Sequence, residues 1–133
     1  MKNILRLLKP DGVFISESHY FLSLVKTLQY DTIYHEHLRY YTVLSLKNIF
    51  QKYGMKIIKL RKINTHGGSI RVYATKNKKY RIDKSVGKAL KEENKFFTKK
   101  NMKLFCDNVF KSKVDLLNKL EKIKKKDFKI FAV

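Results

Sequence analysis

Hydrophobic and polar positions follow two different periods along the first 75 residues, and each period predicts one kind of element. Apolar residues recur three and four positions apart in segments typical of helices, at residues 3–8, 21–28 and 42–53. Short apolar runs or alternation, which are typical of strands, occupy residues 13–16, 55–63 and 69–75. This order predicts an α/β fold, namely the closing half of a sheet whose last strands are antiparallel.

Turn and capping residues mark the ends of several elements. Thr42 is the predicted N-cap of the third helix, and Gly54 is the glycine expected just after its end. The sequence Lys-Pro-Asp-Gly at residues 9–12 predicts a turn in which Gly12 adopts a positive φ. The glycines of residues 64–68 fit the connection of a hairpin between the last two strands.

The remaining residues predict two further helices and one strand. Polar residues 77–79 mark a boundary, and helical patterns follow over 85–97 and 101–124. The longer helix has an apolar stripe that we interpret as a packing surface, and Cys106 on its apolar side is expected in the core. Residues 128–133 form an apolar run that predicts a strand, and because the chain stops within it we expect a fragment of a longer protein.

Composition limits the class of protein. A chain of 133 residues fits one modest domain or pieces of two. One cysteine provides neither an internal disulfide nor the paired spacing of a zinc site. No apolar run approaches the roughly 18 residues of a membrane span, and no signal-peptide pattern is present, so we expect a cytoplasmic protein without membrane association.

The charge is strongly basic. The chain has 26 Lys and 5 Arg against 11 acidic residues, which gives a formal net charge of +20. Such a charge fits a small nucleic-acid-binding module, because cationic side chains neutralise phosphates. Arg, however, makes the bidentate contacts to bases and phosphates, whereas Lys dominates here. We therefore favour a solvated basic surface, and nucleic-acid binding remains the alternative.

Proton-transfer groups are concentrated in residues 30–41, which contain two imidazoles, two carboxylates and four phenols. A neutral imidazole suits the role of a general base, a nearby carboxylate can fix its tautomer, and a phenol can donate a hydrogen bond to a developing oxyanion. Two other interpretations stay open. The segment could be an amphipathic loop that covers a core, or His35, Glu36 and His37 could bind a metal, although residues two apart do not share a helix face.

Two further groups of residues are candidates for a site. Residues 65–69 are either a simple hairpin connection or a loop whose small residues let the backbone approach a substrate, with His66 or Ser69 donating to sugar or phosphate oxygens. Glu17 and His19 follow a strand that we expect to be parallel, where side chains reach a cleft. For His19 we favour ordinary solvation at the end of a strand.

Three motifs in this order resemble the S-adenosylmethionine-dependent sugar C-methyltransferases. They are Leu-Lys-Pro-Asp-Gly-Val-Phe-Ile-Ser-Glu at 8–17, Tyr-Asp-Thr-Ile-Tyr-His-Glu-His at 30–37, and Thr-His-Gly-Gly-Ser-Ile-Arg-Val-Tyr at 65–73. Members of that family methylate a carbon of a nucleotide-linked keto-deoxysugar. The resemblance implies a Rossmann-like class I methyltransferase sheet. It assigns residues 1–76 to the end of that domain, 77–126 to a helical connector and 127–133 to the first strand of a second Rossmann-like domain.

The same resemblance implies functional residues and cofactors. Tyr34, Glu36 and His37 match catalytic positions, with His37 as the base that removes the proton alpha to the ketone, and His35 has no assigned role. The substrate-binding residues it implies are His66, Gly67, Gly68 and Ser69.

The implied cofactors are S-adenosylmethionine, whose Gly-x-Gly turn this chain lacks, and zinc in an N-terminal domain whose cysteines are also missing. We therefore expect a nucleotide-sugar enzyme fragment that is inactive in isolation. A non-catalytic assembly module, in which the stripe of the long helix forms an interface, is a further alternative, and the sequence does not fix the oligomeric state.

Overall fold

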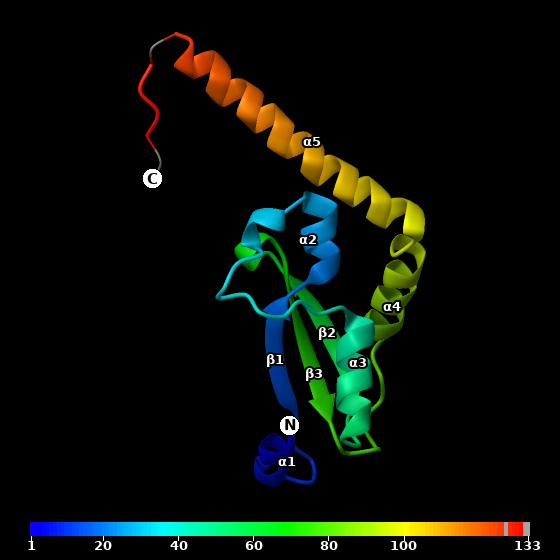
Figure 1. Ribbon diagram of the computed structural model, residues 1–133. Coiled ribbons are helices and arrows are strands. Elements are labelled where there is room, and N and C mark those ends of the chain that lie inside the picture. The colour runs from blue at the N-terminus through cyan, green and yellow to red at the C-terminus, as the bar shows by residue number, and fades with distance from the viewer. Residues whose placement is uncertain (127, 132–133) are drawn as a thin grey trace. The chain divides into compact units, whose positions relative to one another are not determined.

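The computed structural model describes residues 1–126 and 128–131, apart from the side chain of His66, and has a mixed α/β architecture. Its contacts divide the chain into two units, Met1–Thr98 and Lys99–Val133. Unit 1 contains a three-stranded sheet with strand order β1-β3-β2, where β1 is Phe14–His19, β2 is Lys56–Ile63 and β3 is Ser69–Thr75. Both neighbours of β3 are antiparallel to it, so β1 and β2 run in the same direction (Figure 1).

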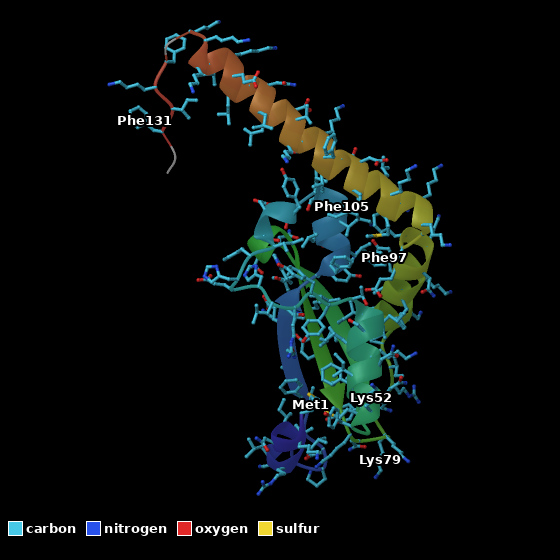
Figure 2. All side chains as sticks on the ribbon, in the orientation of Figure 1. Met1, Lys52, Lys79, Phe97, Phe105 and Phe131 are labelled. Carbon is cyan, nitrogen blue, oxygen red and sulfur yellow. The ribbon has the colours of Figure 1, made fainter. Side chains whose placement is uncertain are left out.

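Helices precede, separate and follow the strands, much as the periodicity predicts. Unit 1 has α1 (Lys2–Leu7), α2 (Phe21–Thr27), the 3₁₀ helix η1 (Tyr30–Thr32), α3 (Val43–Lys52), the 3₁₀ helix η2 (Thr65–Gly67) and α4 (Lys84–Phe96). Unit 2 has α5 (Lys99–Lys124). α3 and α4 pack against β2. The stacked rings of Phe21 and Phe97 join α2 to the residue after α4, and Figure 2 shows Phe97 at that end of α4.

The ends of α3 confirm the capping predictions. Thr42 Oγ1 accepts a hydrogen bond from Ser45 N, and Ser45 Oγ accepts one from Thr42 N, both at 3.0 Å. This reciprocal pair satisfies two amides in the first turn of the helix, where no carbonyl of the helix can reach them. After the helix, Gly54 has φ +68, the left-handed conformation that favours glycine.

A buried carboxylate joins α4 to the start of α3. Glu93 is 2% exposed, and its two oxygens accept hydrogen bonds from Val43 N at 2.5 Å and Leu44 N at 3.0 Å. A negative charge is stabilised at a helix N-terminus by the unpaired amides and by the helix dipole. Burial first, and then the nearby Glu93 carboxylate, raise the pKa of Tyr20. The hydrogen bonds of Glu93 are therefore made at the hydrophobic core of unit 1. Buried members of that core include Leu22, Leu46, Phe50, Leu60, Ile70, Val72, Val86 and Ala89.

Four predictions differ from the structure or are not observed in it. β1 extends to His19, so Glu17 and His19 lie within the strand and do not follow it. Among the described residues, β1 pairs with the antiparallel strand β3 and not with a parallel strand. Gly12 does not adopt a positive φ. Glycine fits there because an added Cβ would meet the Leu8 side chain at 2.9 Å.

The other two differences lie in unit 2. Cys106 is exposed, so the expected core position is wrong, and α5 contains no buried residue. No strand is formed over residues 128–131, and the rest of the strand predicted for 128–133 lies outside the described residues.

Candidate active site

The segment rich in His and Tyr is a loop that begins and ends beside the carboxyl end of β1. At its start, Gln29 Nε2 donates to Gly67 O at 2.8 Å, which connects the loop to the β2–β3 hairpin. At its end, Phe21 N donates to Tyr41 O at 2.9 Å, and Tyr20 and Tyr41 form a parallel bridge. Residues 30–41 are therefore held at both ends, and their side chains lie over the end of the sheet, where α/β proteins commonly bind ligands.

The carbonyl of Thr32 fixes the ring of His37. Thr32 O lies 3.2 Å from His37 Nδ1, and it also accepts a hydrogen bond from Tyr40 OH at 2.7 Å. A carbonyl oxygen can only accept, so the contact places a proton on His37 Nδ1 and leaves the lone pair of a neutral ring on Nε2. The sequence suggested a carboxylate for this task, and the structure assigns it to a backbone carbonyl.

Glu36 instead contacts the phenol of Tyr34. Tyr34 OH donates to Glu36 Oε2 at 3.2 Å, and the rings of Tyr34 and His37 lie 4.8 Å apart. The hydrogen bond to Glu36 raises the pKa of Tyr34 above its ordinary value of 10.0, because the carboxylate favours the protonated phenol. Tyr34 and Glu36 are exposed and His37 is half-buried. The three predicted catalytic residues therefore form one cluster, with a protonated donor beside a potential base.

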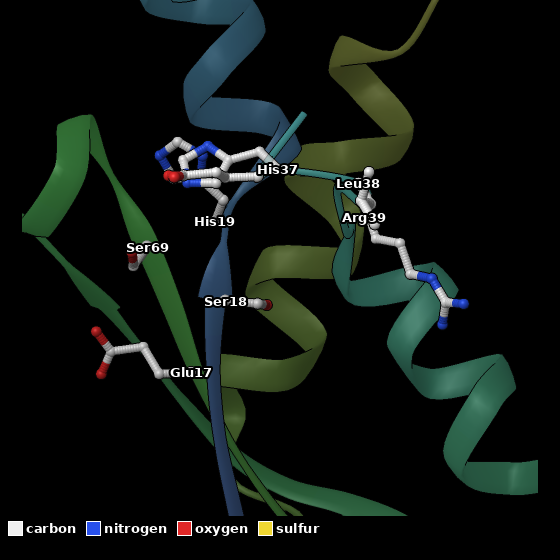
Figure 3. Close-up of a pocket in the computed structure, with 8 residues that line it drawn as sticks. Glu17, Ser18, His19, His37, Leu38, Arg39 and Ser69 are labelled. Carbon is white, nitrogen blue, oxygen red and sulfur yellow. The ribbon is translucent and has the colours of Figure 1, made fainter. Parts of the chain in front are cut away.

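An open cavity of about 660 Å³ lies beside this cluster (Figure 3). Its lining combines loop residues with β1 and the first residue of β3: Glu17, Ser18, His19, Glu36, His37, Leu38, Arg39 and Ser69. The imidazoles of His19 and His37 are adjacent, with ring centroids 5.2 Å apart. His19 therefore lines the candidate site, a role that its interpretation as an ordinary solvated residue did not include. The available signal was the i, i+2 spacing of Glu17 and His19, which places both on one face of a strand.

Glu17 connects the cavity to the hairpin. Its Oε2 accepts hydrogen bonds from Arg71 Nε at 2.8 Å and pairs with Arg71 Nη2 at 2.7 Å, from the directly opposed position of β3. Its Oε1 accepts from Thr65 Oγ1 at 3.2 Å. The two guanidinium nitrogens thus converge on the single oxygen Oε2 in a charge-assisted contact, which leaves Oε1 for Thr65. Glu17 therefore holds the start of the hairpin loop in position.

The predicted substrate-binding residues divide between two places. Ser69 lines the cavity of the candidate active site, and it also lines a second cavity of about 470 Å³ together with Gly67 and Gly68. The role predicted for the His66 side chain falls outside the described residues. Gly67 and Gly68 have φ +74 and +126, as expected for this hairpin, and a Cβ on either would collide with Gln29 or Ser23. Their small size thus serves the close packing of the loop against α2 and the residues after it.

The Gly-x-Gly turn expected to seat the methionine-derived cofactor does not occur in this sequence, and Gly67 and Gly68 contact Gln29 and Ser23 where a Cβ would lie. Within residues 1–126 and 128–131, no group of three His, Cys, Asp or Glu side chains is placed to hold a metal ion. In that same part of the chain, no helix has the length and apolar character needed to cross a membrane.

Comparisons with known proteins identify methyltransferases over both parts of the chain. Residues 1–60 match the family model of a methyltransferase domain, and residues 64–133 match that of the C-methyltransferase C-terminal domain. C-methyltransferase NovU of Streptomyces niveus is 39% identical over 74 residues. That alignment covers 56% of this chain and 18% of the length of NovU.

Proposed function

This chain belongs to the C-methyltransferase family, and from that premise we propose that it carries the deprotonating part of the active site of an S-adenosylmethionine-dependent C-methyltransferase. The observation that carries the proposal is the cluster of Tyr34, Glu36 and His37 beside an open cavity at the end of β1. The proposed substrate is a nucleotide-linked keto-deoxysugar, which rests on the resemblance of residues 30–37 and 65–73 to enzymes of that class.

The first chemical step uses His37 as the base. Nε2 of a neutral His37 accepts the proton from the carbon next to the ketone, and the electrons of the broken C–H bond move onto the ketone oxygen. The contact between Nδ1 and Thr32 O supports this assignment, because it leaves the lone pair of the ring on Nε2. The same contact stabilises the imidazolium that forms.

Tyr34 stabilises the enolate oxygen. Its phenol proton, shared with Glu36 in the free protein, is donated to the oxygen as negative charge develops there. With a pKa above its ordinary value of 10.0, the phenol is protonated at neutral pH. The bound cofactor of such enzymes supplies an electrophilic methyl group. Because this chain has no Gly-x-Gly turn, the role that we propose for it ends at the enolate.

The fold supports a finer placement within the family. Mutually parallel β1 and β2 flank antiparallel β3, as expected for the closing half of a Rossmann-like methyltransferase sheet. The predicted domain limits at residues 76 and 126, the cytoplasmic location and the zinc of a further domain remain predictions.

A chimaeric enzyme tests the proposal. The segment of NovU that aligns with this chain is replaced by the corresponding residues of the chain, and methylation and deuterium exchange at the carbon alpha to the ketone are measured. We expect His37→Gln to slow both reactions by about 10²- to 10⁴-fold, the usual contribution of a general base. Tyr34→Phe removes one oxyanion donor and should reduce the rate by about 10²-fold. His35→Gln is the matched control, because it changes a neighbouring imidazole without an assigned role. Near-full activity of the His37 variant would show that the base is elsewhere.

A further inference from the structure

The proposed base lies on an irregular loop, although proton transfer demands a precise position. His37 belongs to residues 33–42, which connect η1 to α3 without a helix or a strand of the sheet. A general base must come within hydrogen-bond reach of the proton that it accepts. A displacement of about 1 Å can reduce the rate by about 10²-fold. The groups packed around the ring of His37 therefore decide whether this imidazole can act as a base.

Contacts within the loop account for part of that orientation. Thr32 O lies 3.2 Å from His37 Nδ1, and it also accepts hydrogen bonds from Tyr40 OH at 2.7 Å and from Tyr34 N at 3.2 Å. The ring of Tyr34 lies 4.8 Å from that of His37. All of these groups belong to residues 32–40, so they orient the imidazole relative to the loop and not relative to the sheet.

His19 supplies a contact from the sheet. Its imidazole lies edge-to-face with that of His37, with ring centroids 5.2 Å apart and ring planes at 67° (Figure 3). Its ring centroid is also 6.3 Å from that of Tyr40. Edge-to-face rings at such separations attract each other in a specific geometry. His19 thus packs against both of the side chains that bond to the carbonyl of Thr32.

The backbone around His19 is fixed by its neighbours in the sheet. His19 is the last residue of β1 and is paired with Ser69 of β3. Tyr20, the next residue, is 1% exposed, and its backbone N donates to Gly68 O at 3.1 Å. A side chain on a strand is positioned more precisely than one on a loop. The ring of His19 is therefore a reference point on the sheet against which the loop packs.

We propose that His19 is a positioning residue for the base: its ring holds the imidazole of His37 in the orientation in which Nε2 accepts the substrate proton. The inference deepens the proposed function and rests on it. His19 acts through the packing of its ring and exchanges no proton, so the ring is the required feature. The alternative to be excluded is that a nitrogen of His19 is required, as a hydrogen-bond partner or a proton carrier.

The tautomer of His37 provides a test that needs no catalysis. Long-range ¹H–¹⁵N NMR of the full chain with ¹⁵N-labelled histidine, at about pH 8 where an imidazole is mostly neutral, shows which ring nitrogen carries the proton. We expect Nδ1–H in the wild type and a mixture of tautomers in His19→Ala, because the released ring leaves Thr32 O. His37→Gln identifies the signal of His37, and circular dichroism verifies that each variant is folded.

Three further variants separate the ring from its nitrogens. His19→Phe keeps an aromatic ring and should retain the wild-type tautomer of His37. His19→Asn keeps a polar group without a ring and should behave like His19→Ala. His35→Ala is the matched control, because it removes an exposed imidazole of the same loop whose ring contact is with Tyr34. It should leave the tautomer of His37 unchanged.

A double-mutant cycle in the chimaeric enzyme tests whether His19 acts through His37. We expect His19→Ala to lower kcat for deuterium exchange by roughly tenfold, with a much smaller change in KM, since orientation and not binding is lost. In the His37→Gln background the same change should have no further effect. A residue that contacts the substrate independently would lower the rate by the same factor in both backgrounds.

Three results would overturn the role of His19. They are an unchanged His37 tautomer in folded His19→Ala, rescue by Asn but not by Phe, and equal losses of rate in both backgrounds of the cycle. Failure of the proposed function is distinguishable, because it appears as near-full activity of His37→Gln. An active chimaera in which the tautomer of His37 does not respond to His19→Ala would leave the function standing and this inference wrong.

Discussion

Glu36 sets the protonation of Tyr34 in the candidate site, and this can be tested one residue at a time. The carboxylate accepts the phenol proton, and its charge opposes the formation of a phenolate beside it. Glu36→Gln removes the charge, so we expect the pKa of Tyr34 to fall toward its ordinary value of 10.0. Titration of ¹³C-labelled tyrosine by NMR measures this shift. Glu121→Gln, an exposed change of the same kind in α5, should leave Tyr34 unaffected. An unchanged pKa in the Glu36 variant would contradict the assigned hydrogen bond.

At the residue scale, sequence predicts chemistry better than it predicts geometry. The density of His, Glu and Tyr in residues 30–41 is enough to identify a candidate site, and the structure places Tyr34, Glu36 and His37 together. The contribution of His19 depends on the bridge between Tyr20 and Tyr41, which returns the loop to β1. The tautomer of His37 depends on the backbone carbonyl of Thr32, the last residue of the 3₁₀ helix η1. Neither contact has a signature in the pattern of side chains.

Glu93, a residue of α4, caps the N-terminus of α3, so one helix stabilises the other. Its carboxylate accepts hydrogen bonds from two amides that α3 cannot satisfy itself. In Glu93→Gln only one oxygen remains, and the new NH₂ group faces an amide N–H. We expect the free energy of unfolding to fall by about 2 kcal/mol, the scale of a buried hydrogen bond to a charged group. Urea denaturation followed by circular dichroism measures the loss. The exposed Glu121→Gln variant should change stability by less than about 0.5 kcal/mol.

At the element scale, local signals were sufficient where local interactions decide the conformation. Thr42 and Gly54 delimit α3 as predicted, because capping depends on residues only a few positions apart. The predictions were wrong where contacts between residues of different elements decide the conformation. Gly12 lies against the Leu8 side chain, which a Cβ there would displace. β1 extends to His19 because β3 offers partners as far as Ser69. The cap supplied by Glu93 comes from 50 positions away in the chain and could not be seen in advance.

At the scale of the whole molecule, the division between the two family matches does not coincide with a division of the fold. The matches meet between residues 60 and 64, at the end of β2, yet β2 and β3 pair along their whole length. Buried residues from both sides, such as Leu60 and Val72, belong to one core. α4 joins the same core, and Asp83 N donates to Ile58 O at 2.8 Å just before it. The structural unit therefore extends to Thr98, and the family-domain limit at residue 76 stays a prediction.

Truncation tests whether unit 1 folds without unit 2. Every member of the core cluster lies within residues 1–98, and α5 contains no buried residue. We expect a chain that ends at Thr98 to unfold cooperatively, with a free energy of unfolding within about 1 kcal/mol of the full chain, since single domains of this size are usually two-state. A chain that ends at Asn77 is the control. It loses Val86 and Ala89 from the core together with the Glu93 cap, and it should show no cooperative transition. Loss of the transition in the longer truncation would mean that α5 stabilises unit 1, although none of its residues is fully buried.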